Sequence, residues 1–397
     1  MDFKSIKARD KEYIANSYNR QDVWFKKGRG ARLYDDQNRE YIDFASGIGV
    51  SSLGYGDKQY LKAVSKQLGK LCHSSNLFYT APDGRLAAQL CQLSGMKKVF
   101  FSNSGAEANE CAIKAARKYS FDKYGEGRST VITLKNSFHG RTVTTLAATG
   151  QDKFHNYFFP FTEGFRYVEA NDVGGTVAAM DGTVCAVMLE PVQGEGGVLP
   201  LSGDYVRAVA KEAAKRDILL IMDEVQTGIG RTEKFFGFEH FEVKPDIVSL
   251  AKGLGGGLPI GATLLGEKVE RVFGYGDQGS TFGGNPVVCA GACEVVRRVS
   301  QPAFLDEVAK KGALIRSFVA EIHSPYVKEV RGRGLMLGLA LEGIEAVELS
   351  KKLLAAGLVT LTAGGNTLRL LPPLIISESE IERGVKILGK TLKGMEK

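Results

Sequence analysis

Short hydrophobic runs alternate with amphipathic segments through the central part of the chain. The runs predict strands at 98–101, 129–134, 184–189, 218–222 and 247–251. Hydrophobic residues recur with helical spacing in neighbouring segments such as 59–71 and 84–93. Strands that are hydrophobic on both faces and are separated by helices belong to parallel sheets. The pattern therefore predicts an α/β fold with a mostly parallel central sheet.

The two ends of the chain follow a different pattern. Residues 31–34 and 39–44 alternate between hydrophobic and polar side chains around a turn, which predicts a hairpin. After residue 285, helices are followed by strands, another helix, two more strands and a final helix. We predict helices at 286–299 and 304–321 and strands at 327–331, 335–341, 359–362 and 368–371. This change of pattern indicates a second, smaller α+β unit.

The predicted strands of the central part end in residues that are capable of chemistry. Ligands of parallel sheets bind beyond the carboxyl ends of the strands. These ends carry Ser104, His139, Glu190, Asp223 and Lys252. One such residue is expected by chance, but one at each of five strands predicts a binding site.

The composition excludes several classes of protein. Hydrophobic residues make up 44% and charged residues 24% of the 397 positions, which argues against a disordered or fibrous chain. The net charge of +7 is not concentrated in a basic run, so we expect no nucleic-acid partner. No hydrophobic run approaches the roughly 18 residues of a membrane span, and we find no secretory signal, so we expect no membrane partner.

Cysteine usage adds an expectation about the compartment. The six cysteines are scattered, without a CxxC pair or a Cys/His cluster of zinc spacing. Scattered cysteines in a large chain fit a reducing compartment. We therefore expect a cytoplasmic protein without a metal site.

Lys252 and Asp223 each allow two interpretations. Lys252 follows a hydrophobic strand and precedes a glycine-rich segment. It is either a solvated surface lysine or a desolvated amine that forms a Schiff base with an aldehyde. Asp223 either caps a helix or faces the protonated ring nitrogen of a cofactor and keeps that ring an electron sink.

Other segments carry possible binding groups. Ser102–Glu110 follows a strand and opens a helix, so it either caps that helix or binds a phosphate through backbone N–H groups. Phe138 and Arg141 are either a core and a surface residue or a ring-stacking aromatic and a carboxylate-binding cation. Glu190 and Arg369 are charges in hydrophobic strands, where each needs a partner or a ligand.

Together these segments make the chain resemble the class III pyridoxal-phosphate-dependent aminotransferases over essentially its whole length. The segments are Ser102–Glu110, Phe138–Arg141, Leu189–Gly197, Met222–Gly230, Ser249–Gly257, Gly279–Pro286 and Leu368–Pro373. The resemblance implies fold type I, with a large cofactor-binding domain at residues 51–285. Residues 1–50 and 286–397 would form the small domain. The resemblance also implies a homodimer with its sites at the interface.

The resemblance further implies a role for each matching residue. Lys252 would form the covalent link to pyridoxal phosphate and carry the proton, and Asp223 would pair with the ring nitrogen. Other implied cofactor contacts are Ser104, Gly105 and Ala106 at the phosphate, Phe138 and Val225 on the ring faces, Gln226 at the ring hydroxyl, and Thr281 from the other subunit. Arg141, with Ser280 near it, would bind the substrate α-carboxylate.

Glu190 and Arg369 resemble the pair through which this family alternates between two substrates. Glu190 would cover Arg369 while the donor presents its terminal amine, and Arg369 would bind the α-carboxylate of glutamate or 2-oxoglutarate. The expected donor is an acylated diamino acid, N2-acetyl-L-ornithine, as in arginine biosynthesis. Ornithine, 4-aminobutyrate, N-succinylornithine and N-succinyl-diaminopimelate are the alternative donors.

Two other classes of function deserve comparison. Glycine richness also fits a dinucleotide-dependent oxidoreductase, but no GxGxxG follows the first strand and Pro259 argues against a helix after the glycines. A non-catalytic cofactor-binding regulator is the other alternative. The presence of Lys252, Asp223 and Arg141 argues against the regulator.

The chain also departs from the family at Gly54–Lys58, where a Gly-His-x-His-Pro motif is common.

Overall fold

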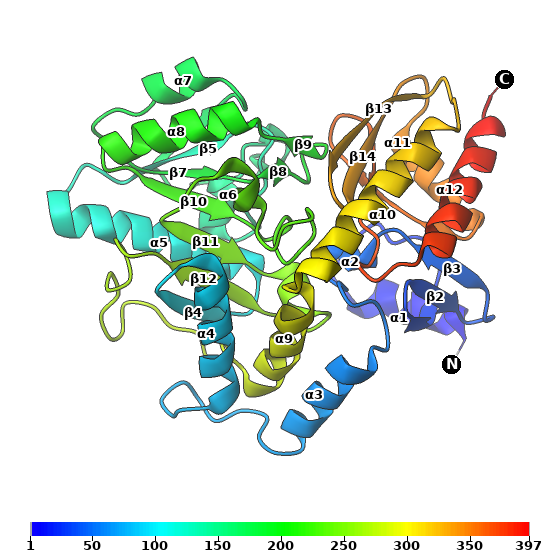
Figure 1. The fold of residues 1–397 in the computed structure, drawn as a ribbon, viewed down its shortest axis with the longest axis horizontal. Coiled ribbons are helices and arrows are strands. Elements are labelled where there is room, and N and C mark those ends of the chain that lie inside the picture. The colour runs from blue at the N-terminus through cyan, green and yellow to red at the C-terminus, as the bar shows by residue number, and fades with distance from the viewer. Residues whose placement is uncertain (1, 397) are drawn as a thin grey trace.

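A seven-stranded sheet forms the centre of the computed structural model, which describes residues 2–396 (Figure 1). The strand order is β4–β12–β11–β10–β7–β5–β6. The strands are β4 (Lys98–Ser102), β5 (Thr130–Leu134), β6 (Phe165–Val168), β7 (Val184–Leu189), β10 (Leu219–Asp223), β11 (Ile247–Leu250) and β12 (Gly261–Leu265). Only β12 runs antiparallel to its neighbours, β11 and β4. The predicted mostly parallel α/β sheet is therefore confirmed.

Sequence patterning did not predict β6 or β12. β12 follows a glycine-rich segment and Pro259, which together indicate a loop. Its first residue, Gly261, lies so close to the end of β4 that a Cβ atom there would stand 2.2 Å from the carbonyl oxygen of Ser104. The glycine therefore permits the close pairing that brings β12 beside β4.

Helices cover the central sheet and begin at recognisable caps. They are α3 (Lys58–Leu68), α4 (Ala81–Ser94), α5 (Gly105–Tyr124), α6 (Val143–Ala148), α7 (Val173–Ala178), α8 (Gly203–Lys215) and α9 (Pro286–Val299). Asp57 caps α3 and Ser202 caps α8 through side-chain oxygens that accept backbone N–H groups. α9 packs against α3 and α4, so the helix predicted to begin at residue 286 lies beside the large sheet.

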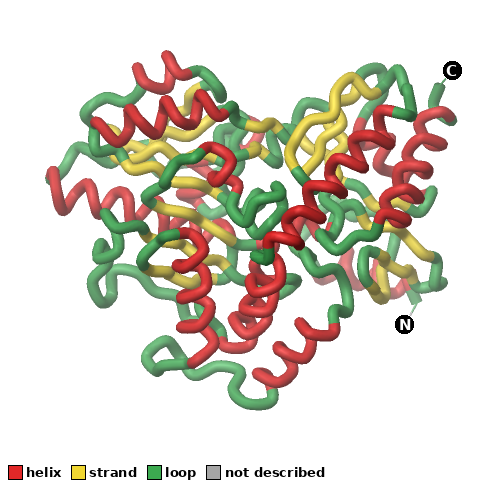
Figure 2. Tube along the Cα trace, viewed as in Figure 1, coloured by secondary structure: helices red, strands yellow, loops and turns green. Residues whose placement is uncertain are grey.

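The chain ends build a second region on the side of the molecule where both termini lie (Figures 1 and 2). One sheet has the order β13–β14–β17–β16 and the other β1–β2–β3–β15. Their strands are β1 (Phe25–Arg29), β2 (Arg32–Asp35), β3 (Glu40–Asp43), β13 (Val327–Arg333), β14 (Met336–Leu341), β15 (Leu358–Val359), β16 (Leu361–Ala363) and β17 (Thr367–Leu370). The predicted hairpin is β2–β3.

The second region differs from the prediction at residues 359–362. These residues do not form one strand, because β15 pairs with β3 and β16 pairs with β17 in another sheet. The parallel pairing of β15 with β3 joins the two chain ends.

The remaining elements are α1 (Phe3–Tyr13), α2 (Ser46–Gly49), α10 (Pro302–Ala320), α11 (Ala346–Ala355), α12 (Glu378–Lys393), the β8 (Val192–Gln193) and β9 (Leu199–Pro200) pair, and the 3-10 turns η1 (Asp152–Phe154), η2 (Gly237–Phe241) and η3 (Lys252–Gly255).

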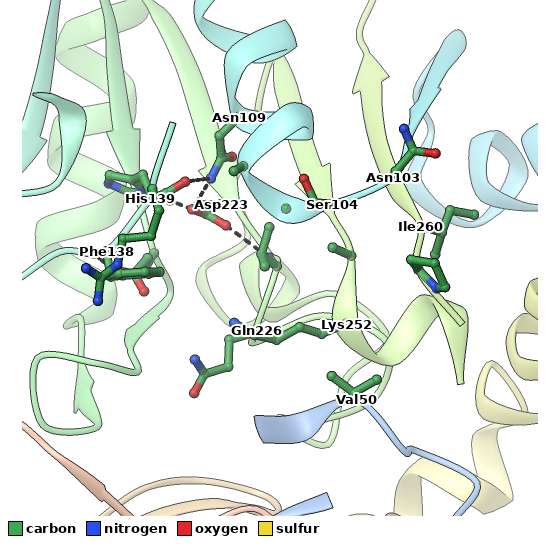
Figure 3. A pocket seen from close by; sticks show the side chains of 18 of the residues that line it. Val50, Asn103, Ser104, Asn109, Phe138, His139, Asp223, Gln226, Lys252 and Ile260 are labelled. Carbon is green, nitrogen blue, oxygen red and sulfur yellow. Dashed lines mark hydrogen bonds and ion pairs between the residues drawn. The ribbon is translucent and has the colours of Figure 1, made fainter. Parts of the chain in front are cut away.

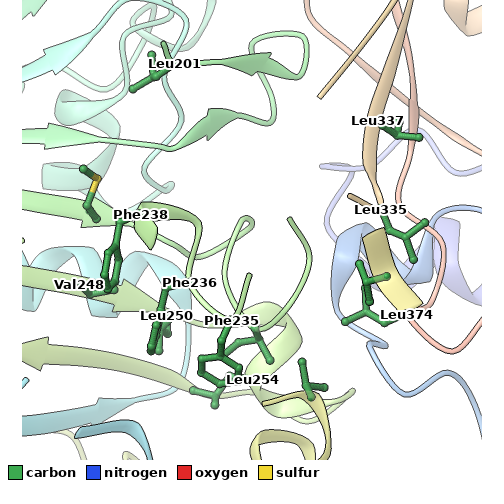
Figure 4. Packing of buried hydrophobic residues seen from close by; sticks show 14 of the residues in the cluster. Leu201, Phe235, Phe236, Phe238, Val248, Leu250, Leu254, Leu335, Leu337 and Leu374 are labelled. Atoms are coloured by element: carbon green, nitrogen blue, oxygen red, sulfur yellow. The ribbon is translucent and has the colours of Figure 1, made fainter. Parts of the chain in front are cut away.

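One hydrophobic cluster extends through both regions (Figure 4). Leu250 and Leu254 contribute to it from the end of β11, and Leu335 and Leu374 contribute from the C-terminal part of the chain. The two regions therefore share buried apolar contacts. Within residues 2–396, no helix has the length and apolar character needed to cross a bilayer.

The packing of α10 on the β13–β14 turn predicts opposite effects for two glycine substitutions. A Cβ on Gly312 would stand 2.3 Å from the carbonyl oxygen of Gly334, so we expect Gly312→Ala to lower the free energy of unfolding by about 1–3 kcal/mol. Gly84 in α4 has open space around it, and we expect Gly84→Ala to raise the same quantity by about 0.5–1 kcal/mol. Denaturant unfolding measures both, and effects of the same sign would contradict the packing.

Candidate active site

A cavity of about 460 Å³ lies beyond the carboxyl ends of the parallel strands (Figure 3). This volume is within the range of small-molecule sites. Ten of the thirteen predicted site residues line it: Ser104, Gly105, Ala106, Phe138, Arg141, Glu190, Asp223, Val225, Gln226 and Lys252. Thr281, Ser280 and Arg369 do not line it. The parallel topology thus gathers residues that are up to 148 positions apart, from Ser104 to Lys252, around one space.

Asp223 is the most firmly held of these residues. It ends β10 and is almost fully buried. Its Oδ2 contacts Nδ1 of His139 at 2.7 Å and accepts a hydrogen bond from Nδ2 of Asn109 at 2.8 Å. Its Oδ1 accepts the N–H of Val225 at 3.0 Å. Three hydrogen-bonding partners therefore hold this one buried carboxylate in place.

Two neighbouring groups respond to the charge of Asp223. Burial opposes protonation of His139, but the hydrogen bond to Asp223 and the charges of Asp223 and Glu190 together outweigh burial and raise the pKa of the imidazole. Glu190, at the end of β7, is buried, and burial raises its pKa to about 7. Its Oε2 accepts the N–H of Phe138 at 2.9 Å. The cavity floor therefore combines an anion, an imidazole and a carboxyl group of raised pKa.

Lys252 lies in the same cavity, directly after β11. Its backbone has a φ of +35°, in the left-handed region that a residue with a Cβ atom rarely adopts. Burial lowers the pKa of its amine. Nζ makes no hydrogen bond or ion pair with any residue between 2 and 396. In Figure 3 the side chain lies between Asp223 and Val50, so an unbonded amine projects into the cavity.

The N-terminus of α5 forms another wall. Ser104 caps the helix by accepting the N–H of Glu107 at its Oγ atom, at 3.2 Å. The N–H groups of Gly105 and Ala106 have no acceptor among residues 2–396. A Cβ on Gly105 would stand 2.6 Å from Cγ1 of Val225, so only glycine fits at this contact. Two free donors at the positive end of a 20-residue helix favour an anion here.

Phe138 and Arg141 lie on the loop after β5. The guanidinium of Arg141 is stacked on the ring of Phe154 at 4.0 Å and lies 5.5 Å from the ring of Phe138. It is exposed and forms no ion pair with the described residues. Aromatic stacking therefore fixes a cation at the mouth of the cavity, where a substrate anion can reach it.

The structure differs from the sequence prediction at Arg369. We expected Glu190 to cover this residue, but Glu195 does so, with Oε1 2.5 Å from Nη1. Glu190 directly follows β7, where the N–H of Phe138 holds its carboxylate. Glu195 lies on the loop that reaches β17, and Arg369 also donates to Oε1 of Gln226 at 3.2 Å. Burial raises the pKa of Glu195, but Arg369 outweighs burial and lowers it.

Ser280 and Thr281 lie on a loop outside the cavity. Oγ of Ser280 accepts a hydrogen bond from Nδ2 of Asn103 at 3.1 Å, next to the start of α5, instead of lying against Arg141. Thr281 is exposed to solvent. The single chain therefore leaves Thr281 outside its own site.

Sequence reasoning missed Asn109 and Glu195 and gave His139 no role. Asn109 lies one turn after Gly105 on α5 and so faces the same side of the helix. Glu195 stands between Gly194 and Gly196, and a Cβ on Gly194 would lie 2.4 Å from Oε1 of Gln226. The glycines on both sides of Glu195 were the available sequence signal that this loop packs closely against another part of the chain.

The cavity fits pyridoxal phosphate in several independent ways. The free N–H groups of Gly105 and Ala106 suit its phosphate. The buried carboxylate of Asp223 suits its ring nitrogen, and the unbonded amine of Lys252 suits its aldehyde. The chain therefore supplies one complementary group for each reactive part of this cofactor.

Comparisons with known proteins agree with this chemistry. The family model described as aminotransferase class-III matches residues 13–392. The acetylornithine aminotransferase of Haemophilus ducreyi is 53% identical over 394 residues, covering 98% of this chain and 99% of that protein. The acetylornithine aminotransferase of Bacillus subtilis is 44% identical over 96% of this chain and 97% of that protein.

Solved structures show the same fold. The ornithine aminotransferase of Toxoplasma gondii superposes with a TM-score of 0.95 at 32% identity, covering 99% of this chain and 96% of that chain. The N-acetylornithine aminotransferase of Stenotrophomonas maltophilia superposes with a TM-score of 0.85 at 38% identity, with 98% of each chain covered. The predicted fold type I is confirmed. The chain belongs to the class III aminotransferases, which depend on pyridoxal phosphate.

Proposed function

We propose that this protein transfers the terminal amine of N2-acetyl-L-ornithine to 2-oxoglutarate, giving N-acetyl-L-glutamate 5-semialdehyde and L-glutamate. The observation that carries the proposal is the unbonded Nζ of Lys252 in a cavity shared with a buried Asp223 and the free N-terminus of α5. The donor follows from the relatives named acetylornithine aminotransferase, which are 53% and 44% identical to this chain. This activity belongs to arginine biosynthesis.

The cofactor is proposed to bind as follows. Gly105, Ala106 and Ser104 hold the phosphate, and Asp223 faces the ring nitrogen. Phe138 and Val225 lie on the two ring faces, and Gln226 approaches the ring hydroxyl. When bound, pyridoxal phosphate supplies a cationic ring that withdraws electrons from the substrate carbon. Asp223 would pair with that ring nitrogen because its three hydrogen-bonding partners hold its carboxylate at a fixed place in the cavity.

Lys252 is proposed to move the proton. With the cofactor bound, Nζ would take the proton from the substrate carbon that bears the amine and give it to the carbon on the other side of the amine nitrogen. Its pKa is lowered by burial, which favours the neutral amine that this step needs. No hydrogen bond from the described part of the chain restrains Nζ, so the side chain is free to swing between the two carbons.

Two arginines are proposed to bind the carboxylates of different substrates. Arg141 takes the α-carboxylate of the donor, whose terminal amine then reaches Lys252. Arg369 takes the α-carboxylate of glutamate or 2-oxoglutarate, and Glu195 must move away from Arg369 for this to happen. The 2.5 Å pair of Glu195 and Arg369 supports Glu195, rather than Glu190, as the group that covers the arginine.

The second candidate function is ornithine transamination. It is supported by the ornithine aminotransferase of Toxoplasma gondii, whose fold matches with a TM-score of 0.95. That protein is only 32% identical to this chain, whereas the acetylornithine aminotransferase of Haemophilus ducreyi is 53% identical. Sequence similarity therefore favours the acylated donor.

A homodimer is proposed because apolar side chains are exposed beside Thr281. Leu77, Phe78, Tyr79 and Phe282 are mostly exposed. Nδ2 of Asn76 donates to the carbonyl oxygens of Ser280 and Gly283, so the two segments form one surface. Covering this surface with a second copy would remove apolar area from water and let Thr281 reach the partner's phosphate site.

We propose domain boundaries near residues 50 and 285 and a cytoplasmic location. Residues 51–285 contain all seven strands of the large sheet, and the two smaller four-stranded sheets use only residues outside this range. α9 follows the second boundary but packs back on α3 and α4 of the large region. All six cysteines are free, which suits a reducing compartment.

The central test of Lys252 is its removal. We expect Lys252→Ala to lower kcat by at least about 10²- to 10⁴-fold, because no other amine of residues 2–396 lines the cavity to carry the proton. Borohydride-treated Lys252→Ala should also lack the added cofactor mass that wild type carries. Lys310→Ala, on the exposed surface of α10, is the control and should behave as wild type. Retained multiple turnover by Lys252→Ala would refute the assignment.

The two glutamates can be told apart by a matched pair of variants. We expect Glu195→Gln to lower kcat/KM for N2-acetyl-L-ornithine about tenfold more than kcat/KM for glutamate, because an uncovered Arg369 captures the donor carboxylate in the wrong orientation. Glu190→Gln should leave the ratio of the two values unchanged. Steady-state kinetics of each half-reaction measures both kcat/KM values. A larger change of their ratio in Glu190→Gln than in Glu195→Gln would instead support Glu190 as the residue that covers Arg369.

A further inference from the structure

Residues 46–49 form one turn of a left-handed helix at the edge of the cavity. Ser46, Gly47, Ile48 and Gly49 have φ values of 42°, 63°, 69° and 76°. The N–H of Val50 donates to the carbonyl oxygen of Ser46 at 2.8 Å, as in a helical turn. Each residue with a Cβ atom costs about 1–2 kcal/mol in this conformation. Contacts elsewhere must therefore hold Ser46 and Ile48 in place.

Those contacts come from buried polar groups on both sides of the turn. Oδ1 of Asp43 accepts the N–H groups of Ala45 and Ser46 at 2.8 and 2.9 Å. Oγ of Ser46 donates to the carbonyl oxygen of Leu371 at 2.6 Å and accepts a hydrogen bond from Nη2 of Arg231 at 3.4 Å. The turn is thus attached to the segment that follows β17.

Arg231 connects this turn to the rest of the site. It is the largest fully buried side chain of the described residues. Its Nη1 donates to the carbonyl oxygens of Leu335 and Pro372 at 3.0 and 2.5 Å. Burial lowers its pKa to about 9, and it forms no ion pair with any residue from 2 to 396. A buried cation bound only to neutral oxygens is costly, so stability alone is a poor reason for it.

The two segments that Arg231 joins bear on opposite parts of the cavity. Val50, directly after the turn, lines the cavity, and a Cβ on Gly253 would stand 3.6 Å from the carbonyl oxygen of Gly49 and 2.7 Å from Oγ of Ser52. The turn therefore packs against the residue next to Lys252. Pro372 lies three residues after Arg369, so the same guanidinium anchors the strand end that carries the proposed carboxylate-binding cation.

We propose that Arg231 is a positioning residue that sets the distance between the left-handed turn and the Arg369 segment, and thereby the binding of both substrates; this role rests on the proposed transamination. Arg231 does not touch the cavity. Its planar guanidinium reaches three oxygens at once, which the single ammonium of a lysine cannot reproduce.

The test compares Arg231→Lys with Arg316→Lys. Arg316, on α10, also donates to two carbonyl oxygens, those of Val330 and Gly332, both at 2.7 Å, but away from the cavity. We expect Arg231→Lys to raise KM for N2-acetyl-L-ornithine and for 2-oxoglutarate about tenfold, with a smaller change in kcat, because both walls shift. Arg316→Lys should leave both KM values unchanged.

A second readout requires neither substrate nor turnover. Hydrogen–deuterium exchange of the protein should become faster in peptides covering residues 44–52 and 367–374 of Arg231→Lys, but not of Arg316→Lys. If wild type lacks transaminase activity, the proposed function fails, and the exchange result still shows whether Arg231 joins the two segments. Unchanged KM values, or exchange that matches the control, would overturn the positioning role.

A milder variant covers the case in which Arg231→Lys does not fold. Ser46→Ala removes the hydroxyl between Arg231 and Leu371 and keeps the buried charge. It should raise both KM values in the same direction by a smaller factor and speed exchange in the same two peptides. Wild-type KM values in a folded Ser46→Ala protein would also overturn the proposal.

Discussion

The buried carboxylate of Asp223 is the interaction on which the site depends. Its partners come from separate parts of the chain, since His139 follows β5, Asn109 lies on α5 and Val225 follows β10. The same hydrogen bonds that hold the carboxylate therefore also fix the loop that carries Phe138 and the helix whose N-terminus holds two free donors. Charge and geometry are set together at the end of one strand.

The left-handed turn and Arg231 extend this order to the second region. Asp223 orients the groups on the sheet, while Arg231 ties the chain ends to the loop that follows β10. The shared hydrophobic cluster supports that link but is not directional (Figure 4). The hydrogen bonds of the Arg231 guanidinium are directional and therefore fix how the two regions are oriented, which apolar packing alone does not.

Much of this arrangement was predictable, and the failures have physical causes. Hydrophobic runs predicted β4, β5, β7, β10 and β11, because buried parallel strands leave a strong pattern. β12 was not predicted because the glycine-rich segment that precedes it resembles a loop. The prediction that Glu190 covers Arg369 was wrong, since Glu195 forms this contact. The sequence shows that Glu190 stands at the end of a strand, but it does not show the path of the loop that brings Glu195 to β17. The turn at Ser46–Gly49 left no signal, since tertiary contacts impose it.

The most direct test is the visible absorption of the purified protein with pyridoxal phosphate, recorded before and after N2-acetyl-L-ornithine is added, with ornithine and 4-aminobutyrate in parallel. The account predicts that the absorbance of the lysine-bound cofactor is lost at the lowest concentration with N2-acetyl-L-ornithine and returns with 2-oxoglutarate. An absent cofactor band would contradict the assignment of Lys252. Loss of the band at lower concentrations of ornithine or 4-aminobutyrate would contradict the proposed donor.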